Sequence, residues 1–175
     1  MIKKLIIIMG ILGTIFACKC KEKAADQQNN GNVNTVEKKN PAVMPEGRLL
    51  RVTYSYQGMM MMEFGNFDLH STPEGCKLTF RHFSNEVTYE VSDTLLDAAR
   101  SIIEQEKMYE YDSYYSFKSE HRMLDGYHWD FDAWFEGDKR ISSGGSHVSP
   151  GGNGLHKIEE LLSKAAQQLV KDEKE

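Results

Sequence analysis

No apolar run in this chain is long enough to cross a membrane. A spanning helix needs about 20 apolar residues, and the longest stretch, Leu5–Ala17, is shorter. Only 3 cysteines occur in 175 residues, which excludes a fold held together by a disulfide framework. A Gly-x-Ser-x-Gly elbow, a His-Glu-x-x-His motif and a P-loop are all missing. No sequence motif therefore indicates a catalytic class, and we expect no cofactor.

Positive charge is scarce relative to negative charge. The chain has 21 Lys and Arg against 26 Asp and Glu, and its formal net charge is −5. No stripe of basic residues appears. An acidic domain of this kind is a poor partner for nucleic acid, so we expect none.

Residues 1–17 have the anatomy of an export signal. Lys3 and Lys4 precede the apolar stretch Leu5–Ala17, and Cys18 follows it. Ile15-Phe16-Ala17-Cys18 resembles the lipobox of bacterial lipoproteins, whose cysteine is lipidated before the signal is removed. That resemblance implies a palmitate-type anchor on Cys18 and a place in the cell envelope, on the periplasmic or outer side of the outer membrane. Ordinary signal cleavage with a soluble product is the alternative.

Composition divides the remainder into a tether and one domain. Residues 18–45 are polar and show no hydrophobic period, so they cannot bury enough apolar area to offset the entropy of ordering. We interpret this segment as a disordered tether. Residues 46–175 form a single domain, because they are numerous enough to bury a hydrophobic core.

The domain has the pattern of an α+β fold. Six segments rich in β-branched and aromatic residues, with alternating polarity, predict strands: 48–57, 63–71, 76–83, 86–91, 127–135 and 139–143. Two segments with apolar residues at helical spacing predict helices: 92–108 and about 153–171. The tyrosine-rich segment 109–117 has no clear assignment. The order ββββ-α-ββ-α predicts a two-layer sandwich of a mainly antiparallel sheet and two amphipathic helices.

Two short turns are also indicated. Pro73 and Gly75 suit a tight turn between the second and third strands, since Pro presets φ and Gly accepts positive φ. Gly137-Asp138 suits a two-residue II′ turn with Gly first. Both turns imply antiparallel hairpins.

The second half of the chain carries a family resemblance. Asp125-Gly-Tyr-His-Trp-Asp-Phe-Asp, then Phe135-Glu-Gly-Asp-Lys-Arg-Ile-Ser-Ser-Gly-Gly145, a proline and a closing amphipathic helix resemble uncharacterised lipoproteins of Bacteroides-type gut bacteria. The likeness covers most of the domain. It implies a Gram-negative envelope and no particular activity.

One polar face suggests a metal site. Alternation along 127–135 places His128, Asp130 and Asp132 on the same side of the strand, and imidazole and carboxylate groups are competent ligands for zinc. Alternate strand positions are about 6.5–7 Å apart, so adjacent pairs converge on one ion more easily than all three residues do. The simpler interpretation is the solvated face of a half-buried sheet.

Three further features allow a binding or structural role. Trp134 with Tyr127 and neighbouring tyrosines would form an aromatic platform for a sugar or a partner protein, unless a helix or loop covers Trp134 in the core. Met59–Met62 would be soft copper ligands or pliable packing. Cys76 has the character of a small buried hydrophobe.

These features favour a non-catalytic, membrane-tethered lipoprotein that binds a protein or a glycan at the envelope. The alternative is a metal-binding protein or a metal-dependent hydrolase that uses His128, Asp130 and Asp132. The two hypotheses differ in their structural expectation. The first requires an aromatic binding surface, and the second requires convergent ligands in a cleft.

Overall fold

The computed structural model describes residues 40–58, 63–116 and 126–173. The predicted signal sequence with Cys18, most of the tether and the Met59–Met62 run lie outside these ranges. Neither helix of the described part combines the length and hydropathy of a membrane span.

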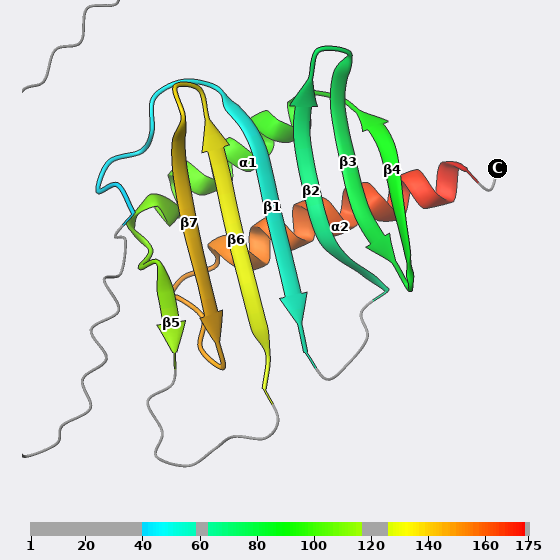
Figure 1. Ribbon diagram of the computed structural model, residues 1–175. Coiled ribbons are helices and arrows are strands. Elements are labelled where there is room, and N and C mark those ends of the chain that lie inside the picture. The colour runs from blue at the N-terminus through cyan, green and yellow to red at the C-terminus, as the bar shows by residue number, and fades with distance from the viewer. Residues whose placement is uncertain (1–39, 59–62, 117–125, 174–175) are drawn as a thin grey trace, which may run out of the picture. The chain divides into compact units, whose positions relative to one another are not determined.

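The described residues build one seven-stranded sheet with both α-helices on the same face (Figure 1). The spatial order is β4-β3-β2-β1-β6-β7-β5, and only the β5–β7 pair is parallel. The strands are β1 (Leu49–Gln57), β2 (Phe64–Thr72), β3 (Gly75–His82), β4 (Asn85–Val91), β5 (Tyr114–Ser116), β6 (His128–Phe135) and β7 (Lys139–Ser146). The helices are α1 (Thr94–Gln105), the 3₁₀ turn η1 (Met108–Glu110) and α2 (Gly154–Asp172). The predicted α+β two-layer sandwich is confirmed, and the sheet remains open.

Period-two alternation sorts the side chains between the two faces of the sheet. On β6, the predicted inward residues Trp129, Phe131, Ala133 and Phe135 are all buried. Leucine, phenylalanine and valine side chains of β1–β3 share this face, and the helices complete the core with Leu96, Ala99, Ile103, Ile158, Leu162 and Ala166. The opposite face carries polar side chains, such as Asp130 and Asp132 of β6. Neither helix of the described residues lies over that face (Figure 1).

Helix α1 ends earlier than the apolar pattern predicts. Lys107 has φ +50°, a left-handed conformation that stops helical hydrogen bonding. Met108, predicted as the last helical residue, therefore belongs to η1, where its side chain is fully buried. The helix begins after Ser92, whose Oγ accepts a 3.3 Å hydrogen bond from the Thr94 N–H.

The tyrosine-rich segment holds a strand that its sequence did not predict. Tyr114, Tyr115 and Ser116 form β5, which pairs in parallel with Gly144–Ser146 of β7. Three residues are too few to show a period, and the partner lies about thirty positions away. β7 is also longer than the predicted 139–143, because Gly144, Gly145 and Ser146 pair with β6 on one side and with β5 on the other.

The hairpin turns are partly as predicted. Pro73 and Glu74 connect β2 to β3, and Thr72 pairs with Gly75 across the turn. The II′ prediction for Gly137-Asp138 is wrong, because both residues have positive φ, +74° and +58°. The pairing of Phe135 with Lys139 leaves a three-residue connection, 136–138, in place of the predicted two-residue turn.

Contacts with the sheet begin before residue 46, the domain start indicated by composition. The side-chain amide of Asn40 donates to the Tyr111 carbonyl at 2.8 Å, and its oxygen accepts from the Ser142 N–H at 2.9 Å. Pro45 is buried, and Met44 packs against the core. The side chain of Asn40 thus satisfies a backbone N–H on a part of the β7 edge that β5 does not cover.

Gly145 allows β6 and β7 to close around a buried tryptophan. The Trp129 Nε1–H donates to the Val148 carbonyl at 2.8 Å. A Cβ on Gly145 would lie 2.6 Å from that nitrogen and 2.7 Å from that oxygen. Any larger residue must therefore displace the indole or break its hydrogen bond.

We predict that Gly145→Ala lowers the free energy of unfolding by about 1–3 kcal/mol through this overpacking. Urea denaturation followed by tryptophan fluorescence measures the change. Gly151→Ala is the matched control, since a Cβ there meets nothing within 4 Å. Equal denaturation midpoints for the two variants would contradict the packing argument.

Candidate functional site

The predicted metal ligands share the outer face of β6 but have different partners. His128 Nε2 lies 3.1 Å from Asp130 Oδ2. Asp132 Oδ1 instead accepts two hydrogen bonds from the Arg140 guanidinium, at 2.7 and 3.1 Å. In residues 40–58, 63–116 and 126–173, no three His, Cys, Asp or Glu side chains are grouped to hold a metal ion. The sheet brings His128 and Asp130 together and directs Asp132 to an arginine.

Trp134 lies on the outer face, where two arginines flank its indole. The guanidinium carbons of Arg51 and Arg140 both lie 4.9 Å from the ring centroid. Arg51 is also held by Asp68 through hydrogen bonds of 2.9 and 2.7 Å, and Arg140 by Asp132. The alternative that Trp134 belongs to the core is therefore wrong; side chains of adjacent strands cover it by cation–π contact. This leaves little indole surface for a sugar.

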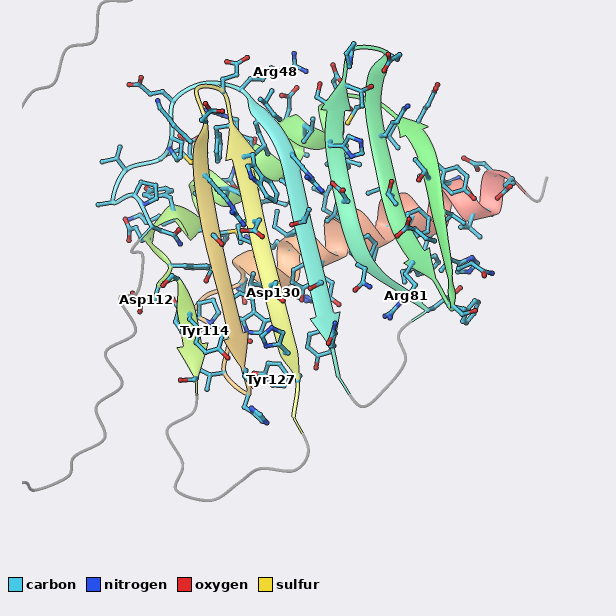
Figure 2. All side chains as sticks on the ribbon, in the orientation of Figure 1. Arg48, Arg81, Asp112, Tyr114, Tyr127 and Asp130 are labelled. Atoms are coloured by element: carbon cyan, nitrogen blue, oxygen red, sulfur yellow. The ribbon has the colours of Figure 1, made fainter. Side chains whose placement is uncertain are left out.

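Tyr127 lies on the other side of the sheet, at a pocket of about 220 Å³. Figure 2 labels Tyr127 at the end of the sheet opposite the β6–β7 turn. We call this site the tyrosine pocket. Its walls come from β1, β6, the loop before α2 and the first turns of α2: Tyr54, Tyr56, Tyr111, Tyr127, Trp129, Ser149, Pro150, Gly152, Leu155, His156 and Glu159.

Strand alternation explains why tyrosines line this pocket. Tyr54 and Tyr56 are two positions apart on β1, so both face the helices, and Tyr56 pairs with Trp129 of β6. The rings of Tyr56 and Tyr127 stack with centroids 5.6 Å apart. A tyrosine suits the end of a core, because its ring packs like phenylalanine while its hydroxyl needs a polar partner.

Glu159 places a carboxylate in this aromatic wall. It lies in the second turn of α2 and is half-buried. Burial raises the pKa of the Glu159 carboxyl, and the opposing effects of His156 and of a hydrogen bond with Tyr54 do not cancel this increase. Burial also raises the pKa of Tyr54, and the nearby Glu159 charge adds to that rise. Perturbed carboxyl groups in concave sites are common at functional positions.

The positive end of the α2 dipole is already occupied. The Glu106 carboxylate accepts hydrogen bonds from the Lys157 ammonium and from the Asn153 N–H, and the Lys157 bond is the main cause of its lowered pKa. The Tyr111 hydroxyl accepts from the Gly154 N–H. These contacts satisfy donors at the helix start that would otherwise attract an anion. The glycine-rich segment 151–154 at the start of α2 is therefore better explained as a connection than as a phosphate cradle.

Cys76 has the structural role expected of it. The free thiol is 2 % exposed, and burial raises its pKa to about 11. A thiol in this state is a poor nucleophile at neutral pH. It packs on β3 with the core and lines no part of the tyrosine pocket.

Sequence reasoning singled out Tyr127, but in a platform with Trp134, and it did not name Tyr54, Tyr56 or Glu159. A signal for Glu159 was present, since helical spacing places it between Leu155 and Leu162 on the apolar stripe. A carboxylate at such a position needs a polar or ligand environment. No sequence pattern, however, could place that helix position beside β1.

Comparison of the chain with protein-family models, with curated proteins and with solved structures gives no match. The function proposed below is therefore argued from the chain's own residues.

We predict that Glu159→Gln becomes increasingly more stable than the wild type as pH rises above the ordinary carboxyl value of 4.5. The raised pKa of Glu159 means that the folded state binds this proton more tightly, so stability falls as pH rises through that pKa. Glutamine does not titrate, so the variant does not lose stability through this group as pH rises. Thermal melts between about pH 4 and pH 7 would record the difference.

Glu160→Gln is the control and should show the opposite trend. Lys164 lowers the pKa of the exposed Glu160 carboxyl by a side-chain hydrogen bond, so its stabilising effect is present above 4.5 and is lost as pH falls. Parallel pH profiles for the two variants would contradict the assigned environment of Glu159.

Proposed function

We propose that this protein is a membrane-tethered lipoprotein of the cell envelope that binds a glycan without catalysing a reaction on it. The tyrosine pocket carries the proposal. It is concave, aromatic and supplied with a carboxylate, an imidazole and several hydroxyl groups. Ligand sites in proteins combine these features: apolar walls with a few convergent polar groups.

A single sugar unit suits the size of this pocket. A volume of about 220 Å³ is below the roughly 300–1,000 Å³ of pockets that hold drug-sized ligands. One face of a pyranose ring is largely C–H and packs on tyrosine rings, while its hydroxyl groups need polar partners such as Glu159, His156 and Ser149. The pocket thus offers both kinds of surface that a sugar presents.

The contents of the pocket favour binding over catalysis. Glycoside hydrolysis ordinarily uses two carboxyl groups on either side of the bond that is broken. Of the residues that line the tyrosine pocket, only Glu159 has a carboxyl group. The hydroxyl of Ser149 lies 3.4 Å from that of Tyr127, which is not the histidine that ordinarily activates a serine nucleophile.

The lipobox-like sequence supports the envelope location. Several acyl chains on Cys18, each contributing about 0.8 kcal/mol per buried CH₂, would hold the protein on a bilayer. The resemblance to Bacteroides-type lipoproteins points to the same compartment. The domain itself then needs no membrane-binding surface.

We predict that Cys18→Ser moves the protein from the membrane fraction to the soluble fraction when it is expressed with its signal in a Gram-negative host. Loss of the thiol removes the site of acylation. Mass spectrometry of the wild type should show an acylated Cys18 at the mature N-terminus. Cys20→Ser is the control and should stay with the membranes. An unacylated, soluble wild-type protein would refute the anchor.

We predict that Tyr56→Ala weakens glycan binding at least about tenfold, equivalent to about 1.4 kcal/mol. Removal of the ring opens one wall of the pocket and breaks the stack with Tyr127. A glycan array identifies the ligand, and isothermal titration calorimetry measures its dissociation constant. Tyr114→Ala, an exposed tyrosine outside the pocket, should bind as the wild type does. Unchanged binding by Tyr56→Ala would exclude the pocket as the site.

A further inference from the structure

The charges that line the tyrosine pocket are unbalanced. Glu159 is its only carboxylate, and no lysine or arginine lines it. Of the lining residues, only His156 can become positive, and it lies exposed at the rim. In the part of the chain that the structure describes, Glu159 forms no ion pair with a side chain. Acids elsewhere in the domain, such as Asp68, Asp132 and Glu106, each have a cationic partner.

A half-buried carboxylate without a cation is costly unless a ligand supplies one. Taking the ionised group out of water disfavours it, and only an opposite charge or hydrogen bonds repay that loss. Tyr54 provides one hydrogen bond. The remaining acceptor capacity of the carboxylate is free for a group that enters the pocket.

The aromatic walls favour the same sign of ligand charge. Tyrosine and tryptophan rings carry partial negative charge on their faces and attract cations, and aromatic cages of this kind recognise ammonium groups. Six of the lining side chains are phenol or indole rings or the imidazole of His156, and four of them are tyrosines. An anionic ligand would meet repulsion from Glu159 and from the ring faces.

The start of α2 does not reverse this preference. Its positive pole borders the pocket through Leu155 and His156. Glu106 and the Tyr111 hydroxyl already accept hydrogen bonds from the first backbone donors, so a negative side chain offsets that pole. The local field in the pocket is then dominated by Glu159 and the rings.

We propose that the ligand of the tyrosine pocket carries a positively charged ammonium group, which lies between the Glu159 carboxylate and the tyrosine rings. This inference deepens the proposed glycan-binding role and rests on it. Two sources share the chemistry: an amino sugar with a free ammonium group, and a quaternary ammonium headgroup such as choline. Either is small enough for a site of about 220 Å³.

Calorimetric titration of the full-length protein in detergent and phosphate buffer tests the inference, since amine buffers would compete. The cationic probes are D-glucosamine and choline. Their neutral counterparts are N-acetyl-D-glucosamine with D-glucose, and 3,3-dimethylbutan-1-ol, which replaces the choline nitrogen by carbon. We expect at least one cation to bind about tenfold or more tightly than its neutral counterpart. Whether glucosamine or choline shows this preference identifies the source.

Glu159→Gln should abolish the preference for the cation while leaving the fold intact, as judged by its melting temperature. Glu160→Gln is the matched control, because its carboxylate is exposed and pairs with Lys164, and it should retain the preference. Tyr56→Ala should weaken the binding of cationic and neutral probes alike. This set of variants separates the effect of charge from that of the aromatic wall.

The outcomes distinguish the two proposals. Neutral sugars that bind as tightly as cations, with a dependence on Tyr56 but not on Glu159, would overturn the ammonium inference and leave the glycan-binding function standing. Cation binding that is indifferent to both Glu159 and Tyr56 would overturn both. Failure of both cations to bind at about 10 mM would also overturn the inference, because such affinity is weaker than about −3 kcal/mol.

Discussion

The fold depends on a sheet that is covered on one face only. The central strand β1 pairs with β2 on one side and β6 on the other, and α1 and α2 both pack on the same face of these strands. Strict alternation along the strands then determines which face each side chain occupies: apolar residues contact the helices, and polar residues face solvent. A shift of one residue in any central strand would exchange the two sets.

The two faces of the sheet consequently offer different chemistry. On the outer face, several charges are paired within the protein, as in the pairs of Arg51 with Asp68 and Arg140 with Asp132. On the inner face, the core changes from aliphatic and phenylalanine residues to tyrosines at the end of the sheet that lies against the first turns of α2. Glu159 stands at that boundary without a cationic partner in the described residues. The contrast between satisfied and unsatisfied charge is what separates a solvated surface from a candidate binding site.

Sequence pattern predicted those features that depend on local repetition. The alternation in β6 and the apolar stripes of α1 and α2 were sufficient for the strands, the helices and the layer arrangement. β5 was not predicted, because three residues are too few to show a period and its pairing with β7 depends on tertiary contacts. The tyrosine pocket was not predicted for a related reason. Tyr56 and Glu159 are about a hundred positions apart, and only the packing of α2 across the sheet makes them neighbours. The environment of Trp134 likewise depends on the strand order β1-β6-β7, which sequence alone did not provide.

The hydrogen bonds of Asn40 have a mechanical consequence. Among the described residues, Asn40 is the first whose side chain joins the chain to the β7 edge, so it would transmit to the sheet part of any pull on the preceding residues. Because its second partner, Tyr111, lines the tyrosine pocket, part of that load would also reach a wall of the pocket. Rupture of these hydrogen bonds would release only a short segment, because Met44 and Pro45, which pack against the domain, would then bear the force. Asn40 would in this way couple tension in the leading segment to the ligand-holding end of the domain.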